Sequence, residues 1–148
     1  MMDSDRVEIL MAKPYWLVDL LPKQVPEGSP GQYFRIERFY LSQLGTLCRR
    51  FAGFLIRLNC YSDLQVSRDG ESWSTNISPE EMILAFEDSA ASHTPLFILA
   101  GSSDTLVYFS GDDHNLTLYN PDPDALDLMR QLAASEGLFV WGPQQFQP

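Results

Sequence analysis

The chain has 148 residues, of which 45% are hydrophobic and 12% aromatic, and its formal net charge at pH 7 is −10. This composition excludes an intrinsically disordered protein, because such chains are poor in apolar residues and dominated by charge. A domain of this length buries roughly 70% of the surface that its unfolded chain exposes, so it needs no disulfide or metal to fold. We therefore expect a single globular domain over residues 1–148.

The sequence also lacks the marks of a membrane or secreted protein. No stretch of 18 or more residues is uninterruptedly apolar, and acidic residues stand where a secretory signal would carry positive charge. The two cysteines, Cys48 and Cys60, lack the CxxC spacing of redox and zinc motifs. These features predict a cytoplasmic protein with no membrane segment, whose cysteines are small apolar side chains rather than a disulfide.

Charge is distributed unevenly along the chain. Residues 1–31 carry a net charge of −2, residues 32–68 carry +4, and residues 69–148 carry −12 with Arg130 as their one base. An acidic surface repels nucleic acids and anionic membranes and attracts basic proteins. We expect a basic protein partner and neither nucleic acid nor membrane binding. The alternative is that the acids only keep the protein soluble.

The N-terminal third holds two apolar runs and a long loop. Residues 7–11 and 15–21 are separated by Pro14, and the second run alternates as an edge or near-edge strand would. Residues 22–31, PKQVPEGSPG, form a loop that is rich in Pro and Gly and longer than most connections. It is either a functional loop or a surface connection with no function of its own.

Apolar residues recur at steps of three and four between residues 36 and 58, which predicts one long helix. Gly45 and Gly53 would permit a bend within it. Arg49, Arg50 and Arg57 fall mostly on the opposite side from the apolar residues. Such a face either binds an anion or is simply solvated.

The middle of the chain predicts a hairpin followed by a helix. Asp69-Gly70 between residues 60–67 and 71–77 is a strong signal for a tight turn joining two strands. The helix begins after Ser78, which has the sequence of an N-cap with Pro79 at the first helical position and Glu81 completing a capping box.

The C-terminal half predicts three neighbouring antiparallel strands, a helix and a last strand. The strands cover residues 96–100, 105–110 and 115–120, the helix begins after Asp122, and the last strand covers 138–141 before a flexible tail at 143–148. The sequence as a whole predicts an α+β fold, with a mostly antiparallel sheet of about five to seven strands packed with three helices.

The densest polar segment is Asp112-Asp113-His114-Asn115. Carboxylates and an imidazole are possible cation ligands, but a turn between strands requires the same residue types on backbone grounds, and no second histidine completes a ligand set. We therefore predict no metal site and no cofactor. Asp112, Asp113 and His114, together with a partly exposed Trp73, are our candidate residues for binding a partner.

Two functions are compatible with these features. The first is a non-enzymatic, acidic interaction module that binds a basic protein, by general analogy with immunity or adaptor proteins. The second is a small-ligand-binding protein or enzyme whose pocket lies between the 22–31 loop and the helix at 36–58, with Arg49, Arg50, Arg57 and His93 as its ligand-binding residues. A chain whose partner is a second copy of itself is a third prediction.

Overall fold

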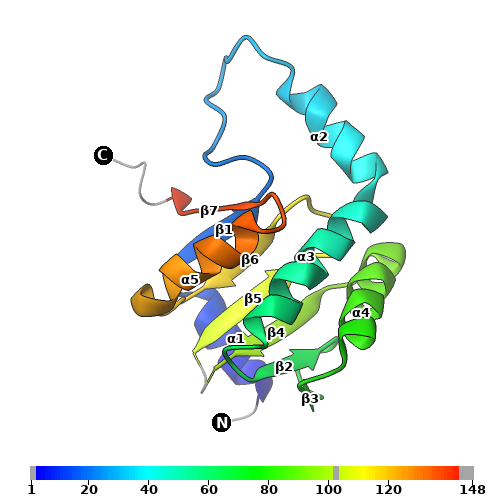
Figure 1. Ribbon diagram of the computed structural model, residues 1–148, viewed down its shortest axis with the longest axis vertical. Coiled ribbons are helices and arrows are strands. Elements are labelled where there is room, and N and C mark those ends of the chain that lie inside the picture. The colour runs from blue at the N-terminus through cyan, green and yellow to red at the C-terminus, as the bar shows by residue number, and fades with distance from the viewer. Residues whose placement is uncertain (1–2, 102–103, 144–148) are drawn as a thin grey trace.

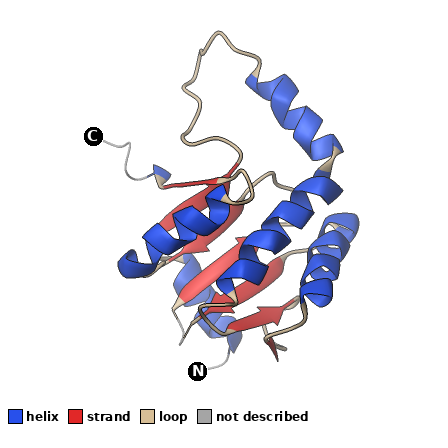
Figure 2. Ribbon diagram, in the orientation of Figure 1, coloured by secondary structure: helices blue, strands red, loops and turns tan. Residues whose placement is uncertain are grey.

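The computed structural model describes residues 3–101 and 104–143, so the predicted tail lies outside the described residues from position 144 onward. Figures 1 and 2 show the arrangement of its helices and strands. In chain order these are α1 (Asp3–Met11), β1 (Tyr15–Asp19), α2 (Tyr33–Ser42), α3 (Leu44–Leu58), β2 (Leu64–Ser67), β3 (Ser74–Thr75), α4 (Pro79–Ser92), β4 (Leu96–Ala100), β5 (Thr105–Phe109), β6 (Leu116–Tyr119), α5 (Pro123–Ala134) and β7 (Phe139–Trp141).

The strands form one antiparallel sheet in the order β3-β2-β4-β5-β6-β1-β7. β5 lies at the centre, and its neighbours are β4 and β6, so the three apolar runs are neighbouring antiparallel strands as predicted. β1 lies next to the edge strand β7, which confirms its prediction as a near-edge strand. The predicted α+β class and the antiparallel sheet are therefore confirmed.

Helices cover both faces of this sheet. α3, α4 and α5 lie on one face, and α1 lies on the other (Figure 1). α1 buries Val7 and Leu10 against Leu99 of β4 and Leu106 of β5. Both faces of the central strands are therefore shielded from water, which explains why their sequences are apolar almost without interruption.

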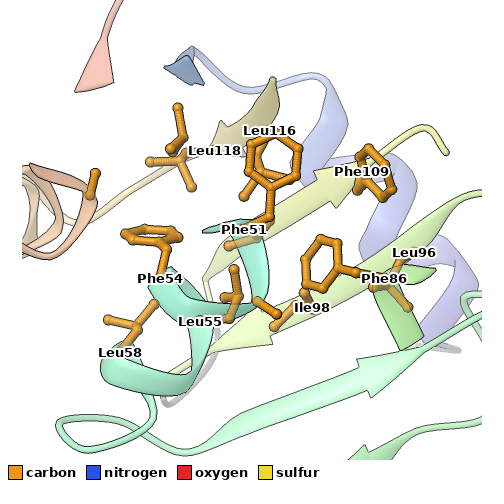
Figure 3. Packing of buried hydrophobic residues seen from close by; sticks show 14 of the residues in the cluster. Phe51, Phe54, Leu55, Leu58, Phe86, Leu96, Ile98, Phe109, Leu116 and Leu118 are labelled. Atoms are coloured by element: carbon orange, nitrogen blue, oxygen red, sulfur yellow. The ribbon is translucent and has the colours of Figure 1, made fainter. Parts of the chain in front are cut away.

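The main core lies between the sheet and the three-helix face. Three aromatic rings from three elements meet there: Phe51 of α3, Phe86 of α4 and Phe109 of β5, each fully buried, with ring centroids 5.4–6.1 Å apart. Figure 3 shows these rings among the leucines of α3 and β6. The apolar residues of α3, which recur every three or four positions, contribute to this core because this spacing places them on the side of the helix that faces the sheet.

The prediction of one helix over residues 36–58 is wrong. α2 ends at Ser42 and α3 begins at Leu44, and Gln43 between them has φ −117° and ψ 36°, outside the helical region. The apolar spacing continues through this break, so spacing alone could not reveal it. α3 buries seven residues, whereas α2 buries none. The apolar residues of α2 therefore do not serve the core.

Within the described residues there are five helices rather than the three predicted. Splitting the long helix adds one, and α1 adds the other. The apolar run at 7–11 is too short to display a helical period, and its packing surface is the far face of the sheet, which no local pattern identifies. None of the helices in the described ranges has both the length and the apolar character required to cross a bilayer.

The predicted hairpin is present, but its strands are shorter than predicted. β2 and β3 pair on either side of a turn in which Gly70 has φ +79°. Ser67 Oγ and the Asp69 carboxylate accept hydrogen bonds from the backbone of residues 69–72, so those amides are not available to a longer ladder. At the other end, residues 60–62 continue the backbone turns of α3 instead of joining the sheet.

The two helix starts predicted from capping residues, after Ser78 and after Asp122, are confirmed. Ser78 Oγ accepts a hydrogen bond from the backbone N–H of Glu81, and the Glu81 carboxylate accepts one from the N–H of Ser78. The Asp122 carboxylate caps α5 by accepting from the N–H of Asp124. These caps satisfy amides that have no partner inside the helix, which fixes where α4 and α5 begin.

Residues 20–42, which we call the arm, comprise the loop at 20–32 and α2. The arm leaves the end of β1, arches away from the sheet and returns to α3 through Gln43 (Figure 1). Its helix keeps large apolar side chains in water: Phe34 is 74% exposed, Phe39 52% and Ile36 40%. The arm is therefore attached to the body through few buried contacts.

Candidate functional site

Polar side chains from four elements meet where the arm reaches the sheet, and we call this group the His114 cluster. Val18 of β1 pairs with Leu116 of the antiparallel strand β6. Asp19, the last residue of β1, and His114, which precedes β6, therefore lie at the same end of this strand pair. Trp141 arrives from β7, which pairs with the other edge of β1. The cluster consists of Asp19, Tyr33, Glu37, His114 and Trp141.

α2 contributes Tyr33 and Glu37, which lie four residues apart and therefore on the same side of the helix. Glu37 Oε2 lies 2.7 Å from His114 Nε2. The Tyr33 hydroxyl donates a hydrogen bond to Glu37 Oε2 (3.1 Å) and lies 3.3 Å from His114 Nε2. The Tyr33 hydroxyl and Glu37 Oε2 of the arm and Nε2 of His114 in the β5–β6 turn thus lie within 3.3 Å of one another.

Asp19 holds the other side of the imidazole. Its Oδ1 lies 3.4 Å from His114 Nδ1, an ion-pair distance without hydrogen-bond alignment. The same oxygen accepts a hydrogen bond from the N–H of Leu20 (2.7 Å), and Oδ2 accepts one from Trp141 Nε1 (3.2 Å). A buried carboxylate is costly unless it is paired in this way. The sheet therefore fixes Asp19, and Asp19 in turn fixes the imidazole.

The cluster stabilises the charged form of His114. Contact with Asp19 raises the pKa of His114 most, burial opposes this, and Glu37 raises it further, to about 9. Burial, together with the hydrogen bond to Glu37, raises the pKa of Tyr33 to about 12, and the charges of Asp19 and Asp113 contribute. At neutral pH the site is therefore an imidazolium held between two carboxylates, beside a protonated phenol.

Two members of the cluster, His114 and Tyr33, keep their protons at neutral pH. A general base needs a lone pair near neutral pH, and the imidazolium of His114 has none. Tyr33 is likewise protonated and cannot act as a base or nucleophile at that pH. In the described part of the chain, no set of three or more His, Cys, Asp or Glu side chains is placed to hold a metal ion.

A cavity of about 600 Å³, which we call the arm cavity, lies between the loop and α2. Its wall is mainly apolar, and Tyr33 connects it to two smaller cavities, of about 210 and 130 Å³, that reach Asp19 and His114. Polar groups thus converge at one end of an apolar cavity, which is the usual composition of a binding site. The apolar lining residues are Leu21, Val25, Pro26, Phe34 and Ile36.

The predicted interaction residues Asp112, Asp113 and His114 belong to the β5–β6 turn, but they differ in exposure. Asp112 and Asp113 are exposed, and Ser110 Oγ accepts hydrogen bonds from both of their backbone amides. The side chain of His114 is only 12% exposed, so it is a member of the cluster rather than a surface contact. Asp112 and Asp113 therefore lie in a turn between two strands, where the sequence predicted that such residue types are favoured by the backbone conformation.

Trp73, predicted to be partly exposed, lies far from this turn in the chain and packs in the smaller core cluster with Phe97 and Leu99. Its exposure is intermediate, and its indole Nε1 is buried without a hydrogen-bond partner in the described structure. The structure does not bring Trp73 together with the His114 cluster.

The residues of the predicted ligand site are not gathered around one pocket. Arg57 pairs with Glu136 beyond the end of α5, and Arg50 lies near Gly137. Arg49 is exposed on α3. His93 caps α4 and pairs with Asp112. The arm cavity borders the 22–31 loop, but Ile36 is the only residue of the 36–58 segment among its lining residues, and none of the four predicted ligand-binding residues lines it.

Sequence analysis missed Asp19, Tyr33, Glu37 and Trp141. Asp19 offered the clearest signal, because it is a carboxylate inside the apolar run YWLVDLL, where a buried acid needs a partner. Tyr33 and Glu37 offered the i, i+4 spacing of two helix residues on one side. Neither signal identifies His114 as the partner, since it lies 95 positions after Asp19 in the chain.

Comparison of the whole chain with models of protein families, with curated proteins and with solved structures finds no match in any of the three.

Proposed function

We propose that the chain is a non-enzymatic interaction module that binds a basic protein where the Asp112–Asp113 turn meets the arm. The observation that carries this proposal is the mainly apolar arm cavity beside exposed carboxylates. An apolar side chain of the partner enters the cavity, and Lys or Arg residues next to it reach the carboxylates. Buried apolar anchors supply most of the energy of such interfaces, and opposite charges give orientation and association rate.

Apolar and acidic groups adjoin each other at this surface. Phe34 and Ile36 line the arm cavity and are both exposed. Asp113 lies close enough to the arm that its charge raises the pKa of Tyr33. Exposed apolar residues that gather beside a cavity and are rimmed by charge are typical of interaction sites, whereas scattered ones are not.

Binding is favoured over catalysis by the charge state of the cluster, in which His114 and Tyr33 both keep their protons at neutral pH. The proposal includes a cytoplasmic location, with which the two unbridged cysteines agree. We also propose that any self-association uses the same arm, because α2 presents its large apolar side chains there.

A peptide array tests the proposal. Wild-type protein should retain peptides that combine an aromatic or aliphatic residue with flanking Lys or Arg, and should release them as salt rises. Asp113→Asn and Phe34→Ser should lose these peptides. The matched controls are Asp127→Asn on α5 and Leu84→Ser on α4, both exposed and on other elements, and they should retain them. Retention of the same peptides by all four variants would contradict the proposed surface.

A second candidate function is the binding of a small molecule in the arm cavity. The supporting observation is the size of the cavity, about 600 Å³, which lies within the range of ordinary ligand sites. Nuclear magnetic resonance with a library of small aromatic compounds discriminates between the two functions. A small ligand should shift the resonances of Tyr33 and Phe34 and should bind Asp113→Asn as well as wild type.

A further inference from the structure

The arm makes its polar contacts with the sheet through a single side of α2. None of the residues of α2 is buried, whereas α3, which follows directly, buries seven. The solvent-facing side of α2 carries Arg35 and Arg38, and the opposite side carries Tyr33 and Glu37. Those two side chains reach His114. Packing therefore contributes little to the position of α2, and these polar contacts contribute much.

We propose that the contacts of Tyr33 and Glu37 with His114 form a charge latch that holds the arm against the sheet. The arm is closed while the imidazole of His114 is protonated, and it opens when that proton is lost or when the Glu37 carboxylate is removed by substitution. This device does not depend on what the arm cavity binds.

The groups that face His114 explain why its proton is needed. A neutral imidazole has one N–H, which can serve only one of the two carboxylates, and the other carboxylate then faces a lone pair. With the proton present, both ring nitrogens carry an N–H: Nε2 donates to Glu37, and Nδ1 faces Asp19 at an ion-pair distance of 3.4 Å. The groups that face His114 are Asp19 from β1, Tyr33 and Glu37 from α2, Asp113 from the turn and Lys23 from the loop. Two further contacts involve their neighbours: Trp141 donates to Asp19, and His93 pairs with Asp112.

Loss of the latch releases the arm from the sheet and does not unfold the rest of the protein. Asp19 ends β1 and His114 lies in the turn just before β6, and the backbone ladder between these two strands remains when the imidazole changes charge. α2 has no such ladder with the sheet and is joined to α3 through the non-helical residue Gln43. Segments with few buried contacts open locally at a lower free energy than the core. Since the loop and α2 form the walls of the arm cavity, opening changes that cavity directly.

Double electron–electron resonance tests the latch on the intact chain. One nitroxide is placed on the exposed Cys60 and the other on Arg35→Cys at the outer side of α2. Because the pKa of His114 is raised to about 9, we expect a narrow distance distribution at pH 7.5 and loss of the narrow component at pH 10. Glu37→Gln should lose it at both pH values.

The control pair, Cys60 with Leu84→Cys on α4, joins two parts of the body and should stay narrow throughout. Tyr33→Phe is a milder second variant, which removes only the hydroxyl contacts and should lose part of the narrow component at pH 7.5. An Arg35–Cys60 distribution that is unchanged by pH 10 and by Glu37→Gln overturns the proposal. Equal broadening of the control pair also overturns it, because the change would then be global.

Discussion

The charge of His114 makes the stability of the fold depend on pH. The pKa of His114 is raised from 6.5 to about 9, first by Asp19 and then by Glu37. The folded protein therefore holds this proton more tightly than the unfolded chain does. The resulting stability is fully present below about pH 6.5 and is lost as the pH rises through about 9.

A pKa shift of this size corresponds to about 3 kcal/mol in favour of the protonated form. The side chain of His114 is 12% exposed, so solvent screening removes little of this energy. We expect the free energy of unfolding to fall by about 2 to 3 kcal/mol between pH 6.5 and pH 10 from His114 alone. Cys48 adds a separate loss above about pH 9, because burial raises the pKa of its thiol to about 12.

The contribution of His114 is isolated as the difference between wild type and His114→Gln, since both proteins share Cys48. Urea unfolding followed by circular dichroism at pH 6.5, 8, 9 and 10 gives this difference directly. It should be largest at pH 6.5 and should shrink steadily toward pH 10. A difference that stays constant across this range would refute the reasoning, because it would mean that the imidazole does not gain its charge from the cluster.

Three further substitutions test the packing and the caps by urea unfolding at pH 7. Phe86→Ala should cost about 3 to 5 kcal/mol, because the ring is fully buried against Phe51 and Phe109. Gly111→Ala should cost about 2 kcal/mol or more, since φ there is +94° and an added Cβ would lie 2.6 Å from the carbonyl oxygen of Thr94. Ser78→Ala should cost about 1 kcal/mol through loss of the cap of α4. An unchanged midpoint in any of the three would contradict the contact concerned.

Features determined by neighbouring residues could be predicted from the sequence. The start of α4 follows from Ser78 and Glu81, and the turn between β2 and β3 follows from Asp69 and Gly70, because each signal acts within four residues. The strands at 96–100 and 105–109 follow from apolar runs that only a doubly covered sheet position accepts.

Features determined by distant residues could not be predicted. Gly45 indicates only that a bend is permitted near the end of α2 at Ser42, and the apolar spacing continues into α3, so a complete break at Gln43 could not be predicted. The His114 cluster joins segments that lie far apart in the chain, and although Asp19 stands out as an acid in an apolar run, its partner cannot be identified until the sheet register is known. The turn at Asp112 and Asp113 can be predicted because turn chemistry is local, whereas the burial of His114 depends on where α2 lies.

In this structure His114 lies between Asp19 and Glu37, which raise its pKa to about 9, and the most direct test is a nuclear magnetic resonance titration of its ring protons. The resonances are assigned by their loss in His114→Gln. We expect a midpoint near pH 9 in wild type and a lower midpoint in Glu37→Gln. A wild-type midpoint at pH 6.5, the ordinary value for histidine, would contradict both the charge state of the cluster and the latch that depends on it.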